Sequence, residues 1–321
     1  MHSIVFLDRA TLAPGVRLRR PAFAHRWSEF ERTETADVVR RLDGATIAID
    51  NKVPLRRETL EQLPDLKLVA VAATGTDCID KDCCRERGIV VSNVRNYAGH
   101  TVPEHVFALI LALRRNLCAY RDEVRRGAWQ AARQFCFFSH PIDDLHGGNL
   151  GIIGEGVLGQ GVARLGRAFG MNVMFAAHKG KSGLGPLYTP FDEVLETADV
   201  ITLHCPLLPE TRALLGMAEF RRMRRRPVLV NASRGGLVVE EDLERALDEG
   251  LVAGAAFDVA LPEPPPGDSA IMRLAARPDF ILTPHIAWAS SQAQQALADQ
   301  VIDNIERFAQ GTPANVVHGA F

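Results

Sequence analysis

Three residues, Arg234, Glu263 and His285, could do chemistry together, because each follows a short apolar run that predicts a strand. The runs are Val228–Asn231, Ala253–Phe257 and Phe280–Thr283. An imidazole beside a carboxylate is a general acid–base pair, since the carboxylate orients the ring and favours the imidazolium form. A guanidinium binds a carboxylate through two parallel hydrogen bonds, which a lysine cannot form. The three side chains predict proton transfer on a substrate that carries a carboxylate.

Taken singly, each residue also has a plain structural interpretation. Arg234 precedes two glycines and could be a surface arginine in a turn, and His285 could be a histidine that only supports the fold. Ligands bind at the carboxyl ends of the strands in parallel sheets. Because all three residues follow predicted strands, their combination favours a site.

A glycine-rich turn provides a second signal. Gly154, Gly156 and Gly159 form G-x-G-x-x-G directly after the apolar run Leu150–Ile153, and a helix-like stretch follows. In this setting the glycines allow a tight turn, close approach of a pyrophosphate and close helix–strand packing. The helix N-terminus then offers N–H groups to the phosphates. The pattern predicts a dinucleotide site; the alternative is a glycine-rich turn without a ligand.

The end of the next predicted strand, Asn172–Ala176, lacks the acidic residue that usually binds the adenosine ribose. The chain reads Ala177-His178-Lys179 there, and Lys181 and Ser182 follow. Without the acid, a 2′-phosphate is not repelled, and cationic and hydroxyl donors suit it. The sequence favours NADP over NAD; the alternative is an NAD site beside a solvated basic loop.

Strand-like runs alternate with amphipathic helical segments along the whole chain, as in α/β proteins. The first group of predicted strands is Ile4–Leu7, Thr46–Ile49, Leu68–Ala72 and Ile89–Val91. The second group has six members, Leu150–Ile153, Asn172–Ala176, Val200–His204, Val228–Asn231, Ala253–Phe257 and Phe280–Thr283. We therefore expect two Rossmann-like, doubly wound parallel-sheet domains of the α/β class, with the active site in the cleft between them.

Two helices mark the expected domain boundaries. Thr101 and Glu104 have the spacing of a capping box, and an apolar helix should run from there to about Leu113. A long amphipathic helix, residues 292–310, should return to the first domain. We expect a discontinuous substrate (catalytic) domain, 1–98 plus 289–321, and a dinucleotide-binding domain, 99–288.

Composition sets broad limits. The 321 residues are 47% hydrophobic and 24% charged, with a net charge of -2, so nothing draws the chain to nucleic acid or to a membrane surface. No apolar run reaches the roughly 20 residues of a membrane span. Six cysteines in a chain of this length do not predict a disulfide framework. We expect a reduced, cytoplasmic protein.

Three further motifs have weaker interpretations. His100, Glu104 and His105 lie close together but miss zinc-site spacings by one residue, so we expect no metal. The aromatic stretch at 134–141 predicts core or a subunit contact. The basic run Arg221–Arg226 predicts a solvated helix end rather than a nucleic-acid site.

Taken in order, the motifs resemble the D-2-hydroxyacid dehydrogenases. The resemblance covers nearly the whole chain and is carried by ATGTDCID (73–80), TVPEHVFALILALRRN, LGIIGEGVLGQ, HCPLLPET, NASRGGLV, FDV…PEPP and TPHIAW. It is strongest toward the branch of glycerate dehydrogenases, hydroxypyruvate reductases and glyoxylate reductases.

The resemblance implies roles for individual residues. Arg234, Glu263 and His285 would be the catalytic residues, and the backbone of Thr74, Gly75 and Thr76 would bind the substrate carboxylate. The cofactor would be bound by Thr101, Leu158, Gly159, His204, Cys205, Pro206, Ser233 and, at the nicotinamide amide, Asp258. We further expect Trp288 to cap the substrate pocket. A homodimer through the nucleotide domain is also implied.

The expected reaction is hydride transfer between NAD(P)H and a small 2-keto acid. Glyoxylate or hydroxypyruvate would give glycolate or D-glycerate. Alternatives are a nicotinamide-sensing binding protein on the same fold, similar to co-repressors, a dehydrogenase for a bulkier 2-hydroxy acid, and phosphite oxidation. The chain departs from the family pattern at Pro103, Val239 and Ala177.

Overall fold

The structure, a computed structural model, describes residues 1–317. The chain divides into two compact units, which we describe separately. Unit 1 comprises Met1–Ala98 and Ala289–Phe321, and unit 2 comprises Gly99–Trp288.

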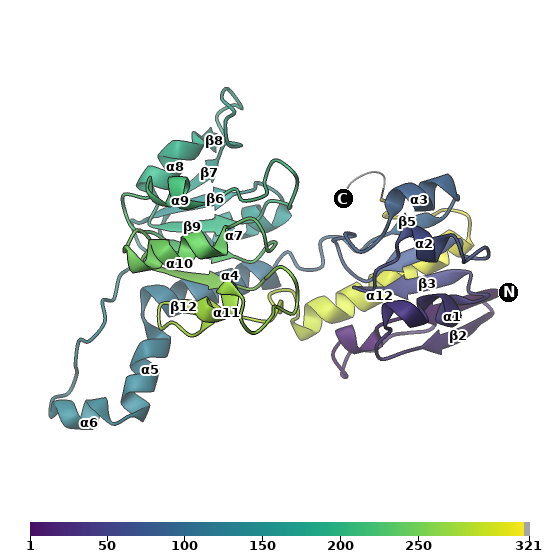
Figure 1. Cartoon of the computed structure of the whole chain (residues 1–321), viewed down its shortest axis with the longest axis horizontal. Coiled ribbons are helices and arrows are strands. Elements are labelled where there is room, and N and C mark those ends of the chain that lie inside the picture. Colours follow the sequence, from purple (N-terminus) through teal and green to yellow (C-terminus); the bar gives the residue numbers. More distant parts are fainter. Residues whose placement is uncertain (318–321) are drawn as a thin grey trace. The chain divides into compact units, whose positions relative to one another are not determined.

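Unit 1 contains a five-stranded parallel sheet in the order β2-β1-β3-β4-β5 (Figure 1). Its strands are β1 (His2–Phe6), β2 (His25–Glu29), β3 (Ile47–Asp50), β4 (Leu68–Val71) and β5 (Val90–Ser92). Its helices are η1 (Arg9–Thr11), η2 (Thr35–Asp37), α1 (Val38–Leu42), α2 (Arg57–Leu60), α3 (Lys81–Glu86) and α12 (Ser291–Ala309). The central strands β3 and β4 are buried along their whole length, as expected for parallel strands covered on both faces.

The long helix α12 belongs to unit 1 although it comes last in sequence. It packs against β4, and Leu297, Val301 and Ile305 on one face of the helix are buried. The Asn304 side chain donates a 2.9 Å hydrogen bond to the Asn93 carbonyl just after β5. This helix therefore closes the sheet of a unit whose other elements lie before residue 99.

Unit 2 contains a seven-stranded parallel sheet in the order β12-β11-β10-β9-β6-β7-β8. Its strands are β6 (Asn149–Ile153), β7 (Asn172–Ala176), β8 (Tyr188–Thr189), β9 (Val200–Leu203), β10 (Val228–Asn231), β11 (Gly254–Phe257) and β12 (Phe280–Leu282). Its helices are α4 (Thr101–Arg114), α5 (Leu117–Arg125), α6 (Ala128–Ala132), α7 (Val157–Ala168), α8 (Phe191–Thr197), α9 (Met217–Phe220), α10 (Glu240–Asp248) and α11 (Ala270–Ala275). The two sheets confirm the predicted α/β class with two parallel-sheet domains.

The strand order of unit 2 reverses between β6 and β9. The chain leaves β6 toward β7 and β8 and then returns to pair β9 with the other side of β6. Such a reversal point is where parallel α/β sheets bind ligands, because the connecting loops diverge there. The glycine-rich turn after β6 lies at this point.

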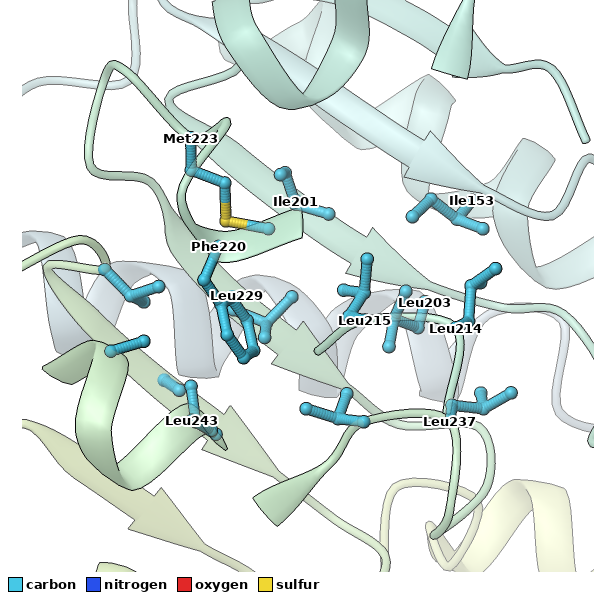
Figure 2. Close-up of a cluster of buried hydrophobic side chains, with 14 of the residues drawn as sticks. Ile153, Ile201, Leu203, Leu214, Leu215, Phe220, Met223, Leu229, Leu237 and Leu243 are labelled. Carbon is cyan, nitrogen blue, oxygen red and sulfur yellow. The ribbon is translucent and has the colours of Figure 1, made fainter. Parts of the chain in front are cut away.

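One face of the unit 2 sheet packs on a continuous apolar cluster (Figure 2). Ile201, Leu203 and Leu229 from the strands meet Phe220 and Leu243 from the covering helices, and all five side chains are fully buried. The burial of these apolar side chains stabilises the sheet and so holds in place the strand ends that carry the candidate site.

Pro103 is explained by the contact between α4 and α7. A Cβ at Gly161 of α7 would lie 2.5 Å from Cγ of Pro103, so the proline fills the space left by the glycine. Pro103 lies in the first turn of α4, where its missing N–H has no intrahelical acceptor.

Val239 lies at the N-cap of α10 and provides no side-chain cap. An Asp or Asn at this position would cap the helix, which is worth about 1 kcal/mol. This departure therefore affects local helix stability rather than the three candidate catalytic side chains.

Several local predictions were wrong. Strands β2 and β8 were missed; both lie at sheet edges, where their residues are half-exposed and less apolar. The capping box does not form, since Thr101 is the first residue of α4 and its hydroxyl donates to Ala287 O at 3.3 Å. Of the two interpretations of the aromatic stretch at 134–141, core is wrong, because Phe135 and Phe138 are 89% and 83% exposed, and the subunit contact stays a prediction.

Within residues 1–317, no helix is both long enough and apolar enough to cross a bilayer.

Candidate active site

Three loops carry the predicted catalytic residues, and they follow three adjacent strands. Arg234 follows β10, Glu263 follows β11 and His285 follows β12, and these strands are neighbours in the sheet. Because the strands are parallel, all three loops leave the same edge.

Glu263 and His285 form a directly bonded pair. Oε2 of Glu263 lies 2.7 Å from Nδ1 of His285, and Oε1 accepts the Ala260 N–H at 3.0 Å. The carboxylate is thus held by its own loop while it orients the ring. Since Nδ1 is engaged, Nε2 is the nitrogen that can exchange a proton with a substrate. The side chains are 28% (His285) and 35% (Glu263) exposed, so a substrate can reach them.

The Arg234 loop is built on the end of β10. The buried Asn231 side chain accepts from Ser233 N at 3.1 Å and donates to Arg234 O at 2.9 Å. At Gly235 a Cβ would lie only 2.2 Å from the Ala260 carbonyl oxygen. The absence of a side chain there lets the arginine loop lie against the loop that carries Glu263.

The loop from Thr283 to Trp288 holds His285 from both sides. The His285 N–H donates to Thr283 O at 3.0 Å, and the Trp288 indole N–H donates to His285 O at 3.0 Å. The sequence predicted that Trp288 caps a substrate pocket; the structure places its indole on the backbone of the histidine loop.

Asp258, predicted to bind the nicotinamide amide, is 1% exposed and accepts hydrogen bonds from this same loop. Ile286 N and Ala287 N donate to its two oxygens at 2.9 and 2.8 Å. In this structure Asp258 therefore binds the backbone of the loop that carries His285.

The glycine-rich turn has the shape that a pyrophosphate needs. A Cβ at Gly159 would lie 2.0 Å from Gly154 O, and one at Gly154, whose φ is +106°, would lie 2.6 Å from the His204 carbonyl carbon. A Cβ at Gly156 would meet no atom within 4 Å, which leaves an open approach. The N–H groups of Val157 and Leu158 open α7 and have no intrahelical acceptor. These residues fit a dinucleotide.

The loop after β9 completes this turn. Ser233 Oγ donates to Cys205 O at 2.6 Å, which brings together two predicted cofactor residues. Both ring nitrogens of His204 are buried without a hydrogen-bond partner among the described residues. Burial lowers the pKa of His204 to about 4, so the ring is neutral at physiological pH.

Two of the three predicted phosphate-binding side chains already face carboxylates. His178 Nε2 lies 3.7 Å from Glu155 Oε1, and Lys179 Nζ lies 2.9 Å from Glu219 Oε1 and 3.2 Å from Leu214 O. Lys181 is exposed. A 2′-phosphate would therefore have to compete with Glu155 for His178 and with Glu219 for Lys179.

In unit 1, the predicted substrate loop follows β4. Thr74 Oγ1 donates to Val94 O at 2.8 Å, and the Asn93 side chain donates to Thr74 O at 2.8 Å. Among the described residues, no backbone–backbone hydrogen bond uses the N–H groups of Gly75 or Thr76. The loop is therefore held by hydrogen bonds at its flanks.

The sequence analysis missed Glu155 and Glu219. Glu155 lies inside the G-x-G motif, where a charged residue is visible in the sequence. The pairing of Glu219 with Lys179 joins loop and helix residues 40 positions apart and had no sequence signal. Within residues 1–317, no cluster of three or more His, Cys, Asp or Glu side chains could hold a metal ion.

Comparison with known proteins agrees with this geometry. The family model for the NAD binding domain of D-isomer specific 2-hydroxyacid dehydrogenases matches residues 107–287. A glycerate dehydrogenase from Methylorubrum extorquens is 50% identical over 315 residues, which cover 98% of each chain.

Two solved structures share the whole fold. A D-lactate dehydrogenase from Aquifex aeolicus, complexed with NAD and lactic acid, has a TM-score of 0.84 and 27% identity and covers all of both chains. An NADPH-dependent glyoxylate/hydroxypyruvate reductase from Sinorhizobium meliloti, in complex with citrate, has a TM-score of 0.83 and 28% identity and covers 99% of this chain and 98% of its own. With its acid–base pair, its glycine-rich turn and these relatives, the chain belongs to the D-isomer specific 2-hydroxyacid dehydrogenases, a family of oxidoreductases that act on CH–OH donors.

Proposed function

We propose that this enzyme reduces glyoxylate or hydroxypyruvate to glycolate or D-glycerate. The observation that carries the proposal is the bonded pair of His285 and Glu263 next to the Arg234 loop. The names of the similar glycerate dehydrogenase and glyoxylate/hydroxypyruvate reductase support the substrate class.

His285 is the proposed acid. In the reductive direction its protonated Nε2 donates to the oxygen of the keto group as negative charge develops there, and Glu263 stabilises the imidazolium. When bound, the nicotinamide supplies the hydride. In the oxidative direction, neutral His285 takes the hydroxyl proton.

Arg234 is the proposed carboxylate clamp. Its planar guanidinium suits two-point binding of a carboxylate and also polarises the neighbouring keto oxygen. Fixing the substrate at two points orients the keto carbon before reaction.

For the cofactor, we propose a preference for NADPH, with NADH also accepted. The support is Ala177, which offers no carboxylate to repel a 2′-phosphate, together with the hydrogen-bond donors His178, Lys179 and Lys181. Glu155 and Glu219 face two of these side chains and moderate the preference.

We also propose that the enzyme is a homodimer formed by the arm at α5, α6 and residues 133–142. This arm extends away from the sheet of unit 2 (Figure 1). It exposes Leu117, Trp129, Phe135, Phe138 and Ile142, which are 47–89% exposed, and Trp129 and Phe135 line a pocket of about 410 Å³. An apolar arm of this kind is costly in water and is typical of an interface.

All six cysteines are free thiols, which supports a reducing, cytoplasmic location.

Initial-rate kinetics with NADPH and NADH over a panel of 2-keto acids tests the proposal. The panel contains glyoxylate, hydroxypyruvate, pyruvate and a branched 2-keto acid. The two small acids should have the highest kcat/KM. A branched acid that is the best substrate would overturn the assignment.

A further inference from the structure

The backbone of the candidate catalytic histidine has a conformation that needs support. His285 has φ +54°, in the left-handed region that residues other than glycine rarely occupy. Such a conformation persists only where the surrounding structure determines it, so the contacts of the loop from Thr283 to Ala287 decide where the imidazole lies.

Asp258 holds this loop on both sides of His285. Its Oδ1 accepts from Thr283 Oγ1 at 2.5 Å and from Ile286 N at 2.9 Å, and its Oδ2 accepts from Ala287 N at 2.8 Å. Asp258 is itself fixed, because its N–H donates to Asn231 O at the end of β10.

Helix α4 contacts the same loop at two points one turn apart. His105 Nε2 lies 3.1 Å from Thr283 Oγ1 and 3.6 Å from Asp258 Oδ1, and Thr101 Oγ1 donates to Ala287 O at 3.3 Å. Residues i and i+4 lie on one face of a helix, so this face of α4 contacts both ends of the loop.

The network also determines the direction of the hydrogen bonds. The hydroxyl of Thr283 has one proton, which goes to Asp258 at 2.5 Å. The Thr283 oxygen can then only accept a hydrogen bond from His105, so Nε2 of His105 carries a hydrogen and is the donor. The chain of hydrogen bonds runs from His105 through Thr283 to Asp258.

We propose that His105 is a positioning residue for His285 and acts through Thr283 and Asp258. It donates the hydrogen bond that fixes the Thr283 hydroxyl on Asp258, and this fixes the loop in which His285 faces Glu263. The inference rests on the proposed function, in which His285 is the acid–base residue. It assigns a role to the second histidine of the His-Thr-Val-Pro-Glu-His segment (100–105), for which no role followed from its spacing.

The test is to compare His105→Leu with His105→Gln by steady-state kinetics with glyoxylate and NADPH. The leucine removes the donor, and kcat should fall on the order of 10-fold or more, because small misplacement of a catalytic group is costly. KM for both substrates should change less than about 2-fold. The glutamine provides an N–H donor and should restore most of kcat. His100→Leu, an exposed position at the start of the same helix, is the control and should behave as the wild type.

Three results would overturn the proposal. They are an unchanged kcat in His105→Leu, a glutamine variant as impaired as the leucine variant, and a rise in both KM values that equals the loss in kcat. His285→Gln, measured in parallel, separates this proposal from the proposed function. If His285→Gln keeps wild-type turnover, the acid–base assignment fails. If His105→Leu keeps wild-type turnover and His285→Gln loses it, the positioning role fails and the acid–base assignment stands.

Discussion

Nδ1 of His285 lies 2.7 Å from Oε2 of Glu263, although the two residues are 22 positions apart and follow different strands. The other oxygen of Glu263 is bound by the Ala260 N–H of its own loop. The carboxylate therefore does not need to move to orient the imidazole.

Replacing Glu263 with glutamine tests the charge of this pair. Glu263→Gln keeps the size and an acceptor oxygen but removes the negative charge that stabilises the imidazolium. We expect kcat for reduction to fall about 10- to 100-fold, while KM for NADPH stays unchanged. Stopped-flow measurement of nicotinamide oxidation checks this, and a variant with wild-type kcat would show that the charge is not used.

The cofactor preference can be tested at the end of β7. In Ala177→Asp the new carboxylate should repel the 2′-phosphate and accept the ribose hydroxyls, so KM for NADPH should rise about 10-fold or more while KM for NADH changes little. Glu219→Gln, which releases Lys179, should lower KM for NADPH. Equal responses of the two cofactors in both variants would favour an NAD site beside a solvated basic loop.

A buried carboxyl group in unit 1 predicts how stability depends on pH. Burial, together with the nearby Asp8 carboxylate, raises the pKa of Asp50 well above its usual range. The group is fully buried and accepts from Val53 N at 3.0 Å. Because the pKa of Asp50 is higher in the folded state than in the unfolded state, proton binding to Asp50 stabilises the folded state. This contribution is complete below pH ~4 and is lost as pH rises through the folded-state pKa.

Asp50→Asn removes this dependence. The variant should be more stable than the wild type at pH 8, by on the order of 1 kcal/mol, and the difference should shrink toward pH 5. Urea unfolding at the two pH values measures it, with the exposed Asp43→Asn as control. Lower stability than the wild type at pH 8 would mean that the ionised carboxylate is needed.

The exposed arm predicts the oligomeric state. Phe135→Asp with Phe138→Asp places two charges on side chains that are 89% and 83% exposed, so the folded protomer should be unaffected. Light scattering after size exclusion should show a dimer for the wild type and a monomer for this variant. A wild-type monomer would contradict the proposed interface.

The buried framework was predictable because its strands are continuous apolar runs. All ten predicted strands exist, within one or two residues at their ends, and the positions after β10, β11 and β12 followed from them. The edge strands β2 and β8 were not predictable in this way, since an edge needs no buried face. Contacts such as the ion pair of Lys179 with Glu219 depend on the fold, and no local sequence pattern predicts them.

The capping box at Thr101 shows a different limit. The spacing to Glu104 was correct, but the hydroxyl of Thr101 bonds to Ala287 O in the histidine loop instead of a helix N–H. A hydrogen bond within the helix is thus replaced by one to a residue 186 positions later in the sequence. Thr101 lies on the same face of α4 as His105, and this face contacts the histidine loop.

In the proposed reaction, His285 transfers the proton to the substrate during reduction. The most direct measurement is single-turnover oxidation of NADPH by glyoxylate or hydroxypyruvate in His285→Gln and in the wild type, with enzyme in excess over NADPH and a saturating concentration of the 2-keto acid. The rate should fall at least about 100-fold in the variant while NADPH still binds with wild-type affinity. A variant that turns over at a rate close to that of the wild type would contradict this role of His285.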